Sequence, residues 1–213
     1  MGQKILIDND ALLKLARYGL LNEAIALFGC SKADVHVLAT AKYVLLPAQN
    51  CLRFCKDAES TLRLENFLRT VKPIVVEPPE LELLDRLNAV QNIDPGEALL
   101  LAVGATNRDM LLITGDKRAL AALCSYNTVA PVANALAGRV VVMEVLFLMF
   151  VEHQFLYIQE CVRSKPDVDT ALTIAFGVSI AADYDLVRGG LSSYIQHLQT
   201  ITRDLLYLPS TNF

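Results

Sequence analysis

Residues 94–124 read DPGEALLLAVGATNRDMLLITGDKRALAALC, and this stretch decides the fold class. The Asp-Pro-Gly-Glu at 94–97 is a capping box with proline at the first helical position, so a helix is expected from there to about Thr106. An apolar strand is expected at 111–114, followed by a Gly-Asp turn and a second helix to about Cys124. A short strand that is apolar on both faces and lies between helices is typical of a parallel sheet covered on two sides.

The chain on either side of this stretch continues the alternation of strands and helices. Short apolar runs predict further strands at 4–7, 35–38, 74–76 and 140–143. Helical spacing predicts a pair of helices over 11–28, broken at Gly19, and further helices over 40–46, 50–70 and 78–90. The inner face of the 50–70 helix is expected to carry Leu52, Cys55, Leu62, Phe67 and Leu68.

The last third of the chain has a different character, because no strand signal follows Glu144. Residues 145–208 read as all-helical, with turns at 164–166 and 188–190 and a final helix that ends before Pro209. We therefore expect an α/β fold in two parts. Residues 1–148 form a three-layer α/β/α domain with a central, mainly parallel sheet, and residues 149–213 form an all-helical C-terminal extension.

The last helix carries an apolar stripe at spacings of three and four, which consists of Leu191, Tyr194, Ile195, Leu198, Ile201, Leu205 and Leu206. This stripe has two interpretations. It packs on the chain's own α/β domain, or it is a surface for a second copy or a partner protein. Because the mean hydropathy of +0.38 is high for a soluble chain, we expect a homodimer or a tight complex through residues 145–208.

The composition limits the class of protein. Of the 213 residues, 54% are hydrophobic and 20% charged, which excludes a disordered chain. No apolar run of about 20 residues lacks a charge, and the N-terminus lacks the features of a signal peptide, so neither a membrane span nor secretion is expected. The five cysteines are odd in number and scattered, which indicates reduced core thiols and a cytoplasmic protein. A net charge of −4 argues against broad nonspecific binding of nucleic acid but not against a local basic groove.

Five acidic residues are expected near the carboxyl ends of the strands, where sites form in parallel sheets. They are Asp8, Asp10, Asp94, Glu97 and Asp116. Helix capping explains most of them, because Asp10 and Asp116 precede helices and the other pair forms the capping box. Asp8 is harder to explain, since a carboxylate that ends a buried strand is costly unless a cation or several donors meet it.

A cluster of three carboxylates at one edge of a sheet would be self-repelling. A hard divalent cation with a preference for oxygen ligands is the usual resolution. Such a cation, magnesium or manganese, activates water for attack on a phosphodiester and stabilises the leaving oxygen.

Three segments resemble the main motifs of PIN-domain nucleases. They are KILIDNDALL at 4–13, DPGEALLLA at 94–102 and LLITGDK at 111–117, and the run at 140–144 is similar to the last strand of that family. The resemblance covers about residues 3–148. It implies a magnesium- or manganese-dependent ribonuclease that acts on RNA, in a family that includes the toxins of many toxin–antitoxin pairs.

The resemblance also assigns roles to single residues. Asp8, Glu97 and Asp116 would be the catalytic, metal-binding carboxylates. Asp10 would occupy a position usually held by Asn or Ser, and Thr114 would be a hydroxyl on the rim. The residues expected around them are Asp94, Lys42, Lys117 and Arg118.

One position departs from the family pattern. The family usually has an acidic residue early in the helix after the second strand, where this sequence has Lys42. Lys42 would then neutralise the carboxylates in place of a metal and leave the site silent. Alternatively, Asp57 or Glu59 on the next helix would supply the missing charge.

Two other functions stay open from the sequence. The first is a degenerate PIN-like scaffold that acts as a binding or assembly module through its C-terminal helices. The second is a phosphatase similar to haloacid dehalogenases, because Asp8 and Asp10 have the spacing of that family's nucleophile and general acid. However, the Gly-Thr pair and the later second Asp that are usual in that family are missing here.

Basic residues for an RNA backbone would have to be local. Lys117 and Arg118 are beside Asp116, whereas a second group recurs along one helical region at Arg53, Lys56, Arg63, Arg69 and Lys72. The second group is also explained as an ordinary solvated face. The three histidines, His36, His153 and His197, have no diagnostic spacing to Ser, Cys or a carboxylate, so no catalytic triad is expected.

Overall fold

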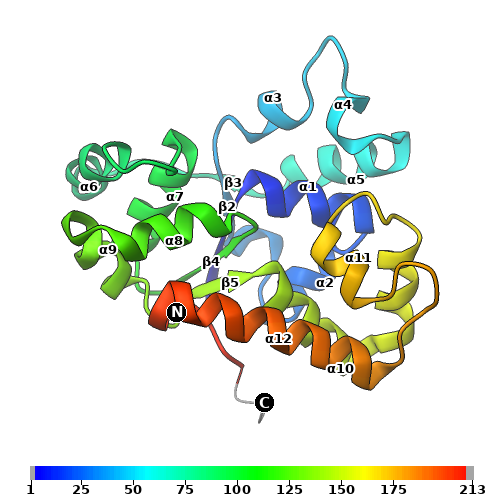
Figure 1. The fold of residues 1–213 in the computed structure, drawn as a ribbon. Coiled ribbons are helices and arrows are strands. Elements are labelled where there is room, and N and C mark those ends of the chain that lie inside the picture. The colour runs from blue at the N-terminus through cyan, green and yellow to red at the C-terminus, as the bar shows by residue number, and fades with distance from the viewer. Residues whose placement is uncertain (1–2, 210–213) are drawn as a thin grey trace.

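A parallel β-sheet of five strands lies at the centre of the protein, in the order β3-β2-β1-β4-β5 (Figure 1). We describe it from a computed structural model, and the description is confined to residues 3–209. The strands are β1 Lys4–Ile7, β2 Val35–Val37, β3 Lys72–Pro73, β4 Met110–Thr114 and β5 Val140–Val142. The strand order reverses at β1 and β4, so the carboxyl ends of these two central strands flank the crevice in which ligands of such sheets bind.

The helices follow the alternation that the sequence predicts. Between β1 and β3 they are α1 Asn9–Tyr18, α2 Leu21–Ala26, the 3-10 turn η1 Lys32–Asp34, α3 Ala41–Leu45, α4 Leu52–Cys55 and α5 Ala58–Leu68. Between β3 and β5 they are α6 Pro78–Asn88, α7 Pro95–Thr106, α8 Lys117–Ser125, the 3-10 turn η2 Asn127–Val129 and α9 Ala130–Ala135. After β5 they are α10 Met143–Arg163, α11 Thr170–Ala175, α12 Tyr184–Thr202 and the 3-10 turn η3 Arg203–Leu205.

The helices form two layers around the sheet, as expected from right-handed crossovers that leave β1 in opposite directions. On one side α1 packs against α5 and α10, and on the other side α7 packs against α6 and α9. The predicted three-layer α/β/α fold with a helical C-terminal part is therefore confirmed.

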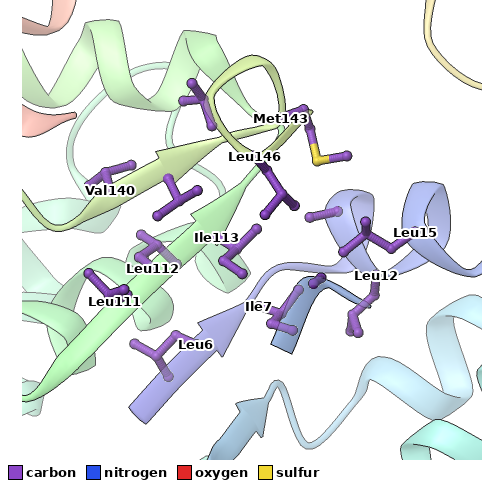
Figure 2. Packing of buried hydrophobic residues seen from close by; sticks show 14 of the residues in the cluster. Leu6, Ile7, Leu12, Leu15, Leu111, Leu112, Ile113, Val140, Met143 and Leu146 are labelled. Carbon is purple, nitrogen blue, oxygen red and sulfur yellow. The ribbon is translucent and has the colours of Figure 1, made fainter. Parts of the chain in front are cut away.

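The core lies between the sheet and these helices. Figure 2 shows apolar side chains of β1, β4 and β5 packed with residues of α1 and of the beginning of α10. Ile7 pairs in register with Ile113, and both are fully buried, as are Leu12 and Leu15 of α1. Because Ile7 and Ile113 are paired, Asp8 and Thr114 follow side by side at the carboxyl edge.

The helix α10 joins the α/β part to the extension. Its first turns, from Met143 to Val151, are buried, and the backbone leaves the helical conformation at Gln154 (φ −147°, ψ 52°). Among residues 3–209 this is the one helix that is long and apolar enough to cross a membrane, but half of its most apolar 18-residue window is buried inside the protein. The predicted boundary at residue 148 lies within this helix, and the division into two parts stays a prediction.

The apolar stripe of the last helix faces the chain itself. The helix α12 packs against α10 and α8, and this contact buries Leu191, Ile195 and Leu198. Tyr194 is only half-buried and Ile201 is 39% exposed. The first interpretation of the stripe accounts for most of its residues, and a partner for the C-terminal helices stays a prediction.

Three expectations about secondary structure are wrong. The predicted 50–70 helix is broken at Lys56, which adopts a left-handed conformation (φ 68°), and Asp57 begins α5 as its N-cap. This break changes the inner face, so Leu52 and Leu62 are 44% and 56% exposed whereas Cys55, Leu64 and Phe67 are buried.

The other two errors concern β3 and α12. The third strand is at Lys72–Pro73 instead of 74–76, and it is an edge strand, where a proline is tolerated because one side of the strand is unpaired. Gly189 and Gly190 do not form a turn but lie inside α12, because the packing of the apolar stripe overrides the low helix propensity of glycine.

The cysteines are all free, as expected. Cys55 and Cys124 are buried, but Cys51 is exposed at the start of α4, so the expectation that all five are core residues is wrong for that thiol.

Candidate functional site

An open cleft of about 510 Å³ lies at the carboxyl edge of the sheet. Its walls are formed by the segment after β1, the loop after β2, the beginning of α7 and the turn after β4. All five acidic residues singled out in the sequence line this cleft: Asp8, Asp10, Asp94, Glu97 and Asp116. The parallel sheet brings together carboxylates that are far apart in the sequence.

Asp8 is the most buried of these carboxylates, with 5% of its surface exposed. It is the N-cap of α1, and its Oδ1 accepts a hydrogen bond from Ala11 N at 2.6 Å. Its Oδ2 accepts from Gly115 N at 3.0 Å and from the hydroxyl of Thr114. Burial raises the pKa of Asp8 to about 6, although these three donors act in the opposite direction.

Thr114 therefore has a definite place in the site. Its side chain is buried at the end of β4 and donates to Asp8, while its Oγ1 accepts a hydrogen bond from Asp116 N at 3.1 Å. The expected rim hydroxyl thus connects the carboxylate after β1 to the turn after β4.

Glu97 and Asp116 form a hydrogen-bonded pair of carboxyl groups in the same cleft. Asp94 is the N-cap of α7, and a reciprocal capping box holds Glu97, with Glu97 N to Asp94 Oδ1 at 2.8 Å and Asp94 N to Glu97 Oε2 at 2.7 Å. Asp116 caps α8 by accepting hydrogen bonds from the N–H groups of Arg118 and Ala119.

The two carboxyl groups of this pair have opposite pKa shifts. Burial and the hydrogen bond with Asp116 raise the pKa of Glu97 to about 8. Burial also acts on Asp116, but the hydrogen bond from Glu97 and the two N–H groups hold the pKa of Asp116 below its usual value. At neutral pH the pair therefore shares one proton.

Asp10 was expected to cap α1, but Asp8 does so, and Asp10 lies in the first turn of the helix. Its Oδ2 forms an ion pair with Lys14 Nζ at 2.8 Å. The same oxygen lies over Gly115, where an added Cβ would come within 1.9 Å of it. Only glycine at position 115 leaves room for Asp10 in this position.

Lys14 is a cation next to the cleft that the sequence did not predict. Burial acts to lower its pKa, but hydrogen bonds to Asp10 and Asp169 raise the pKa well above the usual range, so the ammonium stays charged. The i, i+4 spacing of Asp10 and Lys14 on α1 was a usable signal for the first of these contacts.

The predicted cation Lys42 is exposed, does not line the cleft and forms no ion pair within residues 3–209. Its neighbours Thr40 and Val44 line the cleft instead. The proposed substitutes for the missing acid are also elsewhere, because Asp57 pairs with Lys165 and Glu59 pairs with Arg63.

Lys117 and Arg118 follow Asp116 but have different surroundings. Arg118 is exposed, has its Nη2 3.8 Å from Asp116 Oδ2, and borders an adjoining cleft of about 340 Å³ with Asp94 and Glu97. Lys117 turns away and pairs with Glu144. Glu144, at the carboxyl end of β5, is only 1% exposed, and its Oε2 has no hydrogen-bond partner in the described part of the chain.

The donor chemistry of the cleft suits magnesium or manganese, because every charged group that could act as a ligand is a carboxylate. Asn9 also lines the cleft, and its buried Oδ1 accepts no hydrogen bond from residues 3–209. As the side chains lie, however, no group of three or more Asp, Glu, His or Cys in that range is arranged to hold an ion. The residues fit the metal chemically, but the ligands are not assembled in advance.

Comparisons with protein-family models, with curated proteins and with solved structures found no match.

Proposed function

We propose that this chain is a metal-dependent endoribonuclease of the PIN type, which uses Mg²⁺ or Mn²⁺ to hydrolyse RNA phosphodiesters. One observation carries the proposal. Asp8, Glu97 and Asp116, from three separate segments, line one open cleft at the reversal of strand order, where α/β sheets bind ligands.

The charge state of the cleft supports the proposal. Without a cation, burial raises the pKa of Asp8 to about 6 and that of Glu97 to about 8. Carboxyl groups in a cleft whose pKa values are raised by burial and by neighbouring charges are a feature of functional sites. A divalent cation would replace the shared proton between Glu97 and Asp116.

The residues would have distinct tasks. Asp8, Glu97 and Asp116 would hold the cation, which supplies an activated water and stabilises the charge on the leaving oxygen. Thr114 and the N–H of Gly115 fix the orientation of Asp8, and Asp94 fixes the backbone of Glu97. The exposed guanidinium of Arg118, beside the cleft, would contact an RNA phosphate.

The wider setting is part of the same proposal. We place the protein in the cytoplasm, in a toxin–antitoxin or defence system, with a homo-oligomeric or protein partner on the C-terminal helices. Five free cysteines are compatible with a reducing compartment.

One observation favours a second function, a catalytically degenerate scaffold. No three carboxylates within residues 3–209 form a ready ligand set, and the proton shared by Glu97 and Asp116 satisfies that pair without a metal. In this case the cleft would be structural and the helical extension would carry the function.

Cleavage of a labelled single-stranded RNA in the presence of Mn²⁺ separates the two functions. The nuclease predicts cleavage that Asp8→Asn abolishes, since asparagine still caps α1 but loses the charge. Asp183→Asn is the matched control, because Asp183 caps α12 in the same way, by accepting from Leu186 N at 2.9 Å, but lies outside the cleft. Absence of both cleavage and Mn²⁺ binding by calorimetry would refute the nuclease and favour the scaffold.

A further inference from the structure

The segment between α10 and α11 is joined to α1 by two ion pairs. Arg17 Nη2 lies 2.6 Å from Asp167 Oδ2, and Lys14 Nζ lies 2.8 Å from Asp169 Oδ2. Figure 1 shows α11 beside α1 in the view. The helical extension therefore contacts the helix that Asp8 caps and whose first turn carries Asp10.

The two ion pairs have different surroundings. The side chain of Asp167 is 64% exposed, so its pair with Arg17 is largely solvated. The side chain of Asp169 is 9% exposed, and it also caps α11 by accepting from Leu172 N at 3.0 Å. Asp169 is thus a fixed and buried charge, whereas Asp167 is not.

Lys14 connects Asp169 to the cleft. Its Nζ is 2.8 Å from Asp10 Oδ2 as well as from Asp169 Oδ2, and only 17% of its side chain is exposed. The same Nζ would be 3.4 Å from a Cβ at Gly115, and Asp10 Oδ2 lies over that glycine. Asp169, Lys14 and Asp10 form a continuous chain of charges that ends in the wall of the cleft.

The charge balance shows what Asp169 does. With Asp169 present, the two carboxylates outnumber the ammonium, so the group adds one negative charge to the edge of the cleft. Without Asp169, Asp10 alone would offset the positive charge of Lys14. The pair of Asp10 and Lys14 would then be neutral and would add no negative charge beside Asp8. The cleft would then attract a divalent cation less strongly.

We propose that Asp169 is a positioning residue for the acidic cleft: through Lys14 it holds Asp10 over Gly115 and keeps the cleft negative enough to bind a divalent cation. The helical extension is then a component of the site and not an appended module. This inference rests on the proposed function, because it concerns the same cleft.

A pair of variants tests the proposal. Asp169→Asn and Asp167→Asn each remove one ion pair between the same segment and α1, but only the first touches Lys14. Asn at position 169 can still cap α11. We expect Asp169→Asn to weaken Mn²⁺ binding in calorimetry by roughly tenfold, as the loss of one charge near a divalent cation predicts, and Asp167→Asn to change it by less than about twofold.

A third variant separates charge from folding. In Asp169→Asn combined with Lys14→Gln, one negative and one positive charge are removed together, so Mn²⁺ affinity should return toward that of the wild type. Equal Mn²⁺ affinities for Asp169→Asn and Asp167→Asn would overturn the proposal.

A measurement without metal keeps this proposal distinct from the nuclease. The amide of Gly115 donates to Asp8 and lies under Asp10, so its resonance in a ¹⁵N–¹H spectrum of the metal-free protein reports on both. Asp169→Asn should shift this resonance and Asp167→Asn should not. A Gly115 resonance that moves in neither variant overturns the positioning role, whereas a wild-type protein that binds no Mn²⁺ refutes the proposed function.

Discussion

The stability of the metal-free protein should fall as the pH rises from 5 to 8, because burial favours the protonated form of the Asp8 carboxyl group. Its folded pKa of about 6 lies above the ordinary value of 3.8, which serves for the unfolded chain. The folded state therefore binds the proton more tightly than the unfolded state. The stabilisation that protonated Asp8 contributes is fully present below pH 3.8, its pKa in the unfolded chain. It is lost as the pH rises through about 6, its pKa in the folded protein.

The size of the effect follows from the shift. A difference of about two pKa units corresponds to roughly 3 kcal/mol over the whole titration, of which about 1.4 kcal/mol is lost between pH 5 and pH 8. Glu97, whose pKa is raised from 4.5 to about 8, lowers stability in the same direction over the same pH range. His36 acts in the opposite direction, because burial lowers its pKa.

Comparison with Asp8→Asn isolates the contribution of Asp8, since His36 and the other groups are common to both proteins. The chain has no tryptophan, so urea unfolding is best followed by circular dichroism, with EDTA present. We expect the wild type to lose about 1.4 kcal/mol relative to the variant between pH 5 and 8. Parallel stability curves would refute the account of Asp8 as a buried carboxylate that resists ionisation.

Three further substitutions test other contacts. Gly115→Ala should displace Asp10, cost about 1–3 kcal/mol in urea unfolding and weaken Mn²⁺ binding in calorimetry; unchanged Mn²⁺ affinity would count against this contact. Lys117→Met leaves the carboxylate of Glu144 buried and unpaired, so it should destabilise the fold by about 2–4 kcal/mol in urea unfolding, whereas Glu144→Gln should cost clearly less. Equal losses for the two variants would contradict a buried ion pair between Lys117 and Glu144. Phe147→Ala removes a fully buried ring that contacts three other aromatic rings, so thermal or urea unfolding should show a loss of about 3–5 kcal/mol, and a loss below about 1 kcal/mol would be inconsistent with this core.

The sequence predicts best those parts of the fold that local signals determine. The helix α7 begins and ends where the capping box and the apolar run indicate, and β1 and β4 lie within one residue of their predicted limits. The five carboxylates of the cleft follow from the same information, because the carboxyl ends of parallel strands share one edge of a sheet.

Contacts between distant segments leave no local signal. The spacing of Asp10 and Lys14 is visible on one helix, but the partner Asp169 comes from the far end of the chain. Lys117 was expected to face the cleft, and its actual partner Glu144 becomes its neighbour only when β5 is placed beside β4. Likewise, the direction of the Lys42 side chain depends on the short helix α3, which the spacing in the sequence does not orient.

The break in the 50–70 segment has a related cause. A left-handed lysine is uncommon, so Lys56 gave no reason to divide the helix, although Asp57 followed by Ser60 is a recognisable cap. At Gly189 and Gly190 a break was predicted where none exists. The low helix propensity of glycine suggested a turn, but tertiary packing maintains the helix α12 there.

The central claim, that the acidic cleft is a divalent-cation site, is tested most directly by the protons released when Mn²⁺ binds. Calorimetric titrations at pH 7 in two buffers of different ionisation enthalpy measure this number. Because Glu97 shares a proton with Asp116 and has a pKa of about 8, binding in the cleft should release about one proton per ion, and Glu97→Gln should reduce the release to near zero. Mn²⁺ binding without proton release, or no binding at all, would contradict the account.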